Sequence, residues 1–182
     1  MEIRIADRQG IMIQETRINQ MEKMKNKGLF FLLLIIGLVS CGPESHFEEF
    51  IEIKDAKWNY RDRASFEFNI DDTLPAYDIN IGMRINKDYP YKNIYLLVNQ
   101  ISPKQDTLLR RIEIVFNGED GRWYGKKTGN LYEYIIPFKK NITVSDTGLY
   151  KLEIEQNMRD EELSGIYNIG VQVVKKEFSG GR

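Results

Sequence analysis

Hydrophobic and polar positions alternate along most of the chain beyond residue 65. In the clearest run, apolar side chains occupy every second position: Tyr77, Ile79, Ile81, Met83 and Ile85. Successive side chains of a β-strand point to opposite faces of a sheet, so this alternation predicts a strand with one buried face. The same pattern predicts further strands over residues 66–70, 94–101, 108–116, 131–138, 149–156 and 167–174.

Turn-forming residues separate these segments, and no stretch has the period of a long amphipathic helix. Clear turn signals are Asn117-Gly118, Asp120-Gly121, Gly129-Asn130 and Asp146-Thr147-Gly148. We therefore expect an all-β fold over residues 57–178. The spacing predicts an antiparallel β-sandwich of jelly-roll or immunoglobulin-like form, with roughly seven to nine strands.

Residues 24–40 have the pattern of a lipoprotein signal peptide. Lys25 and Lys27 precede an apolar run from Gly28 to Val39, as in the basic and apolar regions of a signal peptide. A helix needs about 20 apolar residues to cross a bilayer. The run is too short for that, so we expect it to be removed.

The cleavage site indicates that Cys41 is a lipid attachment site. Leu38, Ser40, Cys41 and Gly42 form a lipobox, in which the cysteine sulfur receives a diacylglycerol. Each buried methylene contributes about 0.8 kcal/mol and one acyl chain binds only marginally, so several chains are needed for a firm anchor. The alternatives are an ordinary signal peptide with a coincidental cysteine, or a short buried helix. Cys41 is the only cysteine, which excludes an intramolecular disulfide.

The remaining amino-terminal segments flank this signal. We interpret residues 1–23 as a start-site overcall or an extended basic region, and residues 41–56 as the lipidated cysteine and a tether. Within that tether, Phe47 to Ile53 could instead pair as an edge strand. The sandwich domain follows from residue 57.

Composition excludes several kinds of site. The chain has 26 Lys and Arg against 27 Asp and Glu, a net charge of -1, and no basic patch that would suit nucleic acid. Its one histidine, His46, lies in the expected tether, so a histidine metal site or a Ser-His-Asp relay is not expected. A carboxylate pair could serve a hydrolase, and Asp71-Asp72-Thr73 could bind calcium, but turn capping explains those aspartates as well. The available carboxylates are Asp71, Asp72, Asp88, Asp120 and Glu133.

Aromatic residues give a better indication of a binding surface. Exposed Trp and Tyr side chains stack on sugar rings or anchor protein interfaces, because they offer a large area at a low entropy cost. The alternative is that these residues belong to the core or shape turns. The candidates for an interaction surface are Tyr89, Tyr91, Trp123 and Tyr124.

An ordered set of motifs resembles the gliding-motility lipoprotein H family (GldH) of the Bacteroidetes. The resemblance covers nearly all of the chain after the lipobox. It rests on Phe50, Trp58, Phe66-Glu67-Phe68, the run from Tyr77 to Arg84, Tyr89 to Tyr95, Asp106-Thr107, Gly121 to Gly125, Gly148-Leu149-Tyr150, Gln156 to Arg159 and Leu163 to Gly170.

The resemblance implies a non-enzymatic accessory lipoprotein of the cell envelope, associated with gliding and with the export of surface adhesins. It implies no catalytic residue, no metal and no cofactor, and it transfers only Cys41 as a functional position. The expected partners are the membrane, through acyl chains on Cys41, and other gliding or secretion proteins of the envelope. Gly42 after the cysteine favours the outer membrane, facing the periplasm. The alternative function is glycan binding in a polysaccharide-capture system.

Overall fold

Eleven β-strands and one short 3-10 helix make up residues 45–176, the part of the chain that this computed structural model describes. Cys41, the predicted signal peptide and the residues before it lie outside the described residues. The elements are β1 (Phe47–Glu52), η1 (Lys54–Ala56), β2 (Lys57–Asn59), β3 (Ala64–Ile70), β4 (Tyr77–Ile85), β5 (Asn93–Ile101), β6 (Thr107–Val115), β7 (Lys126–Thr128), β8 (Leu131–Ile142), β9 (Gly148–Gln156), β10 (Glu162–Ser164) and β11 (Ile166–Lys175).

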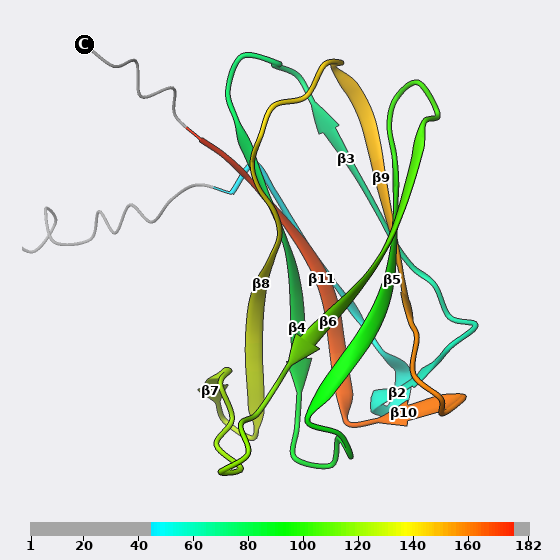
Figure 1. The fold of residues 1–182 in the computed structure, drawn as a ribbon, viewed down its shortest axis with the longest axis vertical. Helices are drawn as coiled ribbons and strands as arrows, with labels where there is room; N and C mark the ends of the chain where they lie inside the picture. The colour runs from blue at the N-terminus through cyan, green and yellow to red at the C-terminus, as the bar shows by residue number, and fades with distance from the viewer. Residues whose placement is uncertain (1–44, 177–182) are drawn as a thin grey trace, which may run out of the picture. The chain divides into compact units, whose positions relative to one another are not determined.

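The strands form two antiparallel sheets that face each other, with a short third pair at one end (Figure 1). One sheet has the order β1-β11-β4-β8-β7 and the other has the order β3-β9-β5-β6, while β2 pairs with β10. The predicted all-β sandwich is therefore confirmed. Three strands, β2, β7 and β10, have only three residues each.

The order of the eight longer strands distinguishes between the two predicted forms of sandwich. Numbered along the chain, they run 1-8-3-6 in one sheet and 2-7-4-5 in the other. The first strand pairs with the last and the second with the last but one, which is the arrangement of a jelly roll. The immunoglobulin-like alternative is excluded by this order.

The core lies between the sheets and follows the alternation in the sequence. On β4, Tyr77, Ile79 and Ile81 are fully buried, whereas Asp78 and Asn80, which alternate with them, are only partly buried. Trp58, on the short strand β2, is also fully buried, and its indole Nε1 donates a hydrogen bond to the carbonyl oxygen of Asp62 at 2.7 Å. Within residues 45–176 no helix is long and apolar enough to cross a membrane.

The sandwich begins earlier than the expected boundary at residue 57. Phe47–Glu52 forms β1, which pairs with β11 from Phe47 opposite Val173 to Glu52 opposite Asn168. Phe47 and Ile51 pack against the core, and burial of apolar side chains is the main favourable term in folding. The edge-strand alternative for Phe47 to Ile53 is thus correct, and this part of the chain is not a free tether.

A ring of one phenylalanine covers two glycines on the outer face of the five-stranded sheet. One row of directly opposite residues crosses the strands β1, β11, β4 and β8. It consists of Phe50, Gly170, Gly82 and Ile135. A Cβ atom at Gly170 would lie 2.5 Å from Cδ1 of Phe50, and a Cβ atom at Gly82 would lie 2.5 Å from its Cζ. The guanidinium of Arg84 lies 4.3 Å from the ring centroid on the same face. The glycines therefore provide the space in which Phe50 attaches β1 to the sheet.

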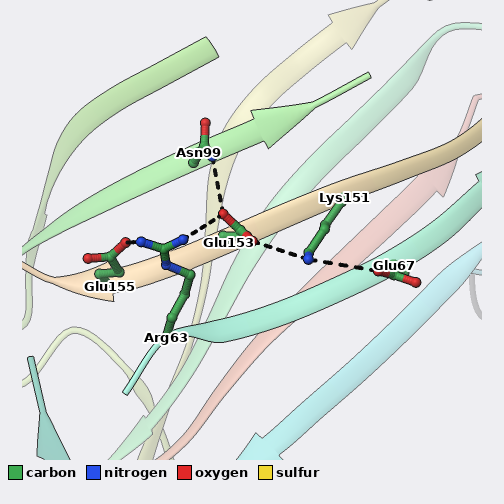
Figure 2. A network of polar contacts seen from close by, with 6 residues as sticks. All are labelled: Arg63, Glu67, Asn99, Lys151, Glu153 and Glu155. Atoms are coloured by element: carbon green, nitrogen blue, oxygen red, sulfur yellow. Dashed lines mark hydrogen bonds and ion pairs between the residues drawn. The ribbon is translucent and has the colours of Figure 1, made fainter. Parts of the chain in front are cut away.

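Charged side chains form a network on the outer face of the other sheet (Figure 2). Glu153 on β9 is its centre: its carboxylate accepts hydrogen bonds from Arg63 at 3.0 Å and from Asn99 at 3.2 Å, and it lies 3.2 Å from Lys151. Arg63 also pairs with Glu155, and Lys151 is 3.9 Å from Glu67. Burial alone would raise the pKa of Glu153, but the hydrogen bonds from Asn99 and Lys151 and the charge of Arg63 hold it below its usual value.

We expect Glu153→Gln to lower the free energy of unfolding at pH 7 by about 1.5 kcal/mol, because it removes the central charge from two cations. The side chain of Glu153 is 12% exposed, against 54% for Glu67. Glu67→Gln is therefore the matched control and should cost less than about 0.5 kcal/mol. Urea denaturation of both variants measures this difference.

Urea denaturation of the same variants at low pH tests whether the pKa of Glu153 is lowered in the folded state. Because the folded-state pKa of Glu153 lies below its usual value of 4.5, its contribution to stability is present above pH 4.5 and is lost as pH falls through the folded-state pKa. The difference in stability between the wild type and Glu153→Gln should therefore narrow as pH falls below 4.5. A difference that does not narrow would show that the effect is not electrostatic.

Candidate interaction surface

The loop between β4 and β5 is held in a fixed shape by Asn86. Its side chain is buried, its Oδ1 accepts a hydrogen bond from the amide of Asp88 at 2.9 Å, and its Nδ2 donates to the Asp88 carboxylate at 2.7 Å. The backbone N–H of Asn86 donates a hydrogen bond to the backbone carbonyl of Gly165 at 2.9 Å, which connects the loop to the start of β11. The residues that follow Asn86 are therefore presented from a rigid turn.

Tyr89 and Tyr91, both predicted to belong to an interaction surface, differ in burial. Tyr89 is 3% exposed, and its hydroxyl donates to the carbonyl of Asn93 at 2.8 Å. Its ring packs edge-on against Phe116 at 5.2 Å, and burial raises its pKa. Tyr89 is a core residue, so its assignment to a surface was wrong, and its packing positions Tyr91.

Tyr91 lies at the edge of an open groove of about 350 Å³. Its hydroxyl donates to the carboxylate of Asp160 at 2.6 Å, and this hydrogen bond raises the pKa of the phenol. Asp160 belongs to the loop between β9 and β10, which Gln156 braces by donating to the Asp160 carbonyl at 2.9 Å. The groove is lined by Tyr91, Tyr95, Arg111, Asn157, Met158 and Arg159.

Arg111 on β6 is held in place across this groove. Its guanidinium lies 4.0 Å from the ring centroid of Tyr95, and its Nε donates to Oδ1 of Asn157 at 2.8 Å. No carboxylate of residues 45–176 forms an ion pair with Arg111 or Arg159. The groove thus combines aromatic surface with two cations that are not paired within the described domain, a composition suited to protein or sugar contacts.

Trp123 and Tyr124 lie in the separate loop between β6 and β7. Trp123 stacks on Tyr132 at 4.9 Å between ring centroids and is partly buried, whereas Tyr124 is 63% exposed. Trp123 also forms a β-bridge with Asn117. Of the four residues predicted to form an interaction surface, only Tyr91 lines the groove described above.

The carboxylates considered for catalysis are engaged in local structure. Asp72 accepts the amide of Leu74 at 2.9 Å, as expected of an aspartate that caps a turn, and Glu133 pairs with Arg84 at 2.7 Å. Asp120 accepts the amide of Arg122 at 3.0 Å. Across residues 45–176, no group of three or more His, Cys, Asp or Glu side chains lies close enough to hold a metal ion.

The groove residues other than Tyr91 could not be chosen from the sequence. Arg111 and Asn157 are 46 positions apart, and they meet because β5 pairs with both β6 and β9. Tyr95 carried a weak signal as one of many tyrosines. The alternation in the strand that contains Arg111 predicted only that its side chain is exposed, and gave no indication of a groove.

Comparison with known proteins gives a consistent result along the described domain. The family model described as GldH lipoprotein matches residues 45–173. A gliding motility lipoprotein GldH homolog of Christiangramia forsetii is 28% identical over 154 residues, which is 81% of this chain and 94% of the relative. The gliding motility lipoprotein GldH of Flavobacterium johnsoniae is 26% identical over 162 residues, which is 85% of this chain and 99% of the relative.

Solved structures match less closely. The VP2 subviral particle of infectious bursal disease virus aligns with a TM-score of 0.35 and 16% identity, over 75% of this chain. The chain spans about a third of the length of that viral protein (34%).

Proposed function

This chain belongs to the GldH lipoprotein family, and on that premise we propose that it is a non-enzymatic interaction module of the gliding apparatus. It is a gliding-motility-associated lipoprotein of the cell envelope, like the relatives named above. We further propose that acyl chains on Cys41 anchor it to the outer membrane and that the domain faces the periplasm. Its partners are other envelope proteins of gliding or adhesin export.

The observation that carries this proposal is the groove beside Tyr91. Tyrosine and arginine are enriched among the residues that dominate protein interfaces, and here Tyr91, Tyr95 and Arg111 lie side by side in fixed orientations. The rigid hydrogen bonds to Asp160 and Asn157 reduce the entropy that these side chains lose on binding. The groove is therefore preorganised for a partner.

Crosslinking in living cells of the native host tests this function. A photo-reactive residue placed at Arg159, on the groove, should capture envelope proteins of gliding or export, identified by mass spectrometry. The matched control is the same residue at Leu74, which is 80% exposed and lies in the loop between β3 and β4, away from the groove. Cys41→Ser, which should leave the membrane fraction, gives the background.

We expect Tyr91→Ala to lower this capture about tenfold, as is usual for an interface anchor. Tyr124→Ala, in the other loop, should leave it unchanged. Thermal unfolding of both variants establishes that the fold is intact. If the wild type and Tyr91→Ala captured partners equally, or if only Tyr124→Ala lost capture, the partner would not bind in the groove.

Glycan binding is the second candidate, and the same groove favours it. The two tyrosine rings could stack on sugar rings while Arg111 and Arg159 contact acidic or hydroxyl groups. Affinity electrophoresis of the wild type and Tyr91→Ala in polysaccharide gels separates the candidates. Retardation that depends on Tyr91, without capture of protein in cells, supports glycan binding.

A further inference from the structure

Strand β6 leaves one edge of the four-stranded sheet open. β5 is its only pairing strand among the described residues, and the register from Thr107 opposite Ile101 to Val115 opposite Asn93 has no bulge. An antiparallel edge strand directs every second pair of amide and carbonyl groups away from the sheet. The outward-facing groups along this nine-residue strand are thus available for pairing.

The other sheet edges carry the features that usually prevent such pairing. β1 is short and acidic, with Glu48, Glu49 and Glu52. β8 is interrupted where it pairs with the start of β4 and contains Pro137. β3 is bordered by the charged network that includes Arg63 and Glu67.

β6 is longer than β1, has no bulge or proline, carries charges of both signs, and exposes apolar side chains on both faces. Leu109 is 63% exposed, Val115 49% and Leu108 39%. Leu109 and Val115 lie on the outer face with Arg111 and Glu113, whereas Leu108 lies on the inner face. A long, flat edge with exposed apolar residues is a typical site of strand addition.

We propose that β6 pairs antiparallel with β6 of a second copy of this chain, so that the two four-stranded sheets become continuous. The two-fold axis passes through Ile112. Residues 109–115 of one copy then lie opposite residues 115–109 of the other. On the outer face, each Arg111 meets Glu113 of the second copy, and each Leu109 meets Val115.

The charges on β6 select this register. An axis at Arg110, Arg111 or Glu113 would place like charges directly opposite each other, which destabilises a strand pair. An axis at Leu109 or Ile114 would pair fewer residues and leave both Arg111 and Glu113 opposite uncharged ones. Only the axis at Ile112 joins opposite charges and apolar residues over most of the strand.

The loop after β6 closes the edge just beyond this pairing. Asn117 bridges to Trp123, and the amide of Tyr124 donates to the carbonyl of Phe116 at 2.9 Å. The open edge therefore ends at Val115, which is the last residue used in the proposed register. Phe116 is fully buried and fixes the end of the strand.

Charge reversal tests the proposal on the full chain purified in detergent. Sedimentation equilibrium should show a dimer for the wild type, and Arg111→Glu should weaken self-association at least tenfold, because two like-charge pairs replace two opposite-charge pairs. Arg111→Glu combined with Glu113→Arg should restore it. A monomeric wild type, or a double variant as weak as the single one, overturns the proposal.

Cysteine pairing in membranes tests the register independently of these charges. Two differently tagged copies are coexpressed, one with Arg111→Cys and one with Glu113→Cys, and should form a mixed disulfide because the two positions lie opposite each other. Two copies that both carry Arg111→Cys are the control, since their Cα atoms would be offset along the strand by about 7 Å, too far for a disulfide. A disulfide in the control alone, or none in either pair, overturns the proposal.

Discussion

Replacing Gly165 with alanine should lower the free energy of unfolding by about 3 to 5 kcal/mol. Gly165 has φ of +82°, and a Cβ atom there would overlap the backbone nitrogen of Tyr89 and lie 2.8 Å from Oδ1 of Asn86. Both neighbours belong to the rigid loop between β4 and β5, and one is backbone. The loop can accommodate the methyl group only by moving, which would break the hydrogen bond from Asn86 to Gly165.

Gly129→Ala is the matched control for this prediction. Gly129 also has a positive φ, +62°, but nothing lies within 4 Å of its Cβ position. It should cost about 1 kcal/mol, the strain of the backbone alone. Urea denaturation of both variants then separates steric exclusion from strain. Equal losses of stability in the two variants would mean that the loop between β4 and β5 moves easily to accommodate the methyl group. Tyr91 would then not be held by a rigid loop.

Replacing Gly170 with alanine should cost about 2 to 3 kcal/mol and should release β1 from the sheet. The new methyl group would lie 2.5 Å from Cδ1 and 2.7 Å from Cγ of Phe50, and 2.8 Å from the carbonyl oxygen of Glu49. These atoms lie at the base of the side chain and in the backbone of β1, so a rotation of the ring cannot relieve the contact. Hydrogen exchange should show faster exchange in β1 than in β4.

Gly82→Ala provides a sharper control, because it meets only the tip of the same ring. With Phe50 present it should destabilise the fold, though less than Gly170→Ala. In a Phe50→Ala background the obstacle is gone, and Gly82→Ala should stabilise the fold by about 0.5 kcal/mol, since alanine loses less backbone entropy than glycine. If Gly82→Ala changed the stability in the same direction with and without Phe50, the position of the Phe50 ring would not depend on the absence of a side chain at Gly82.

The β-sandwich could be predicted from the sequence because the buried side chains are those at the alternating apolar positions. The run from Tyr77 to Ile85 has every second side chain in the core, and the same holds for β3 and β9. Strand order was not predictable in this way. It depends on which strands pair at long range, and the pairing of β1 with β11 joins residues more than one hundred positions apart, such as Glu48 and Gln172.

The binding surface was predictable only in part, because loop residues have no periodicity to show their direction. Tyr89 and Tyr91 flank one proline and looked equivalent in the sequence, yet Tyr89 is buried in the core, whereas Tyr91 is only partly buried and lines the groove. What separates them is Asn86, whose hydrogen bonds set the turn. The edge strand β1 was likewise obscured, because Glu48 and Glu49 made the segment resemble a soluble linker.

The pairing of β1 with β11 also determines how the domain would carry a mechanical load. Phe47 lies level with Val173 and Ile79, near the start of β4, whereas Tyr91 follows the end of β4. A pull between the chain before Phe47 and a partner in the groove would therefore act along the strands. The six residue pairs of β1 and β11 would then resist in shear, all together, rather than open one after another as a zipper does.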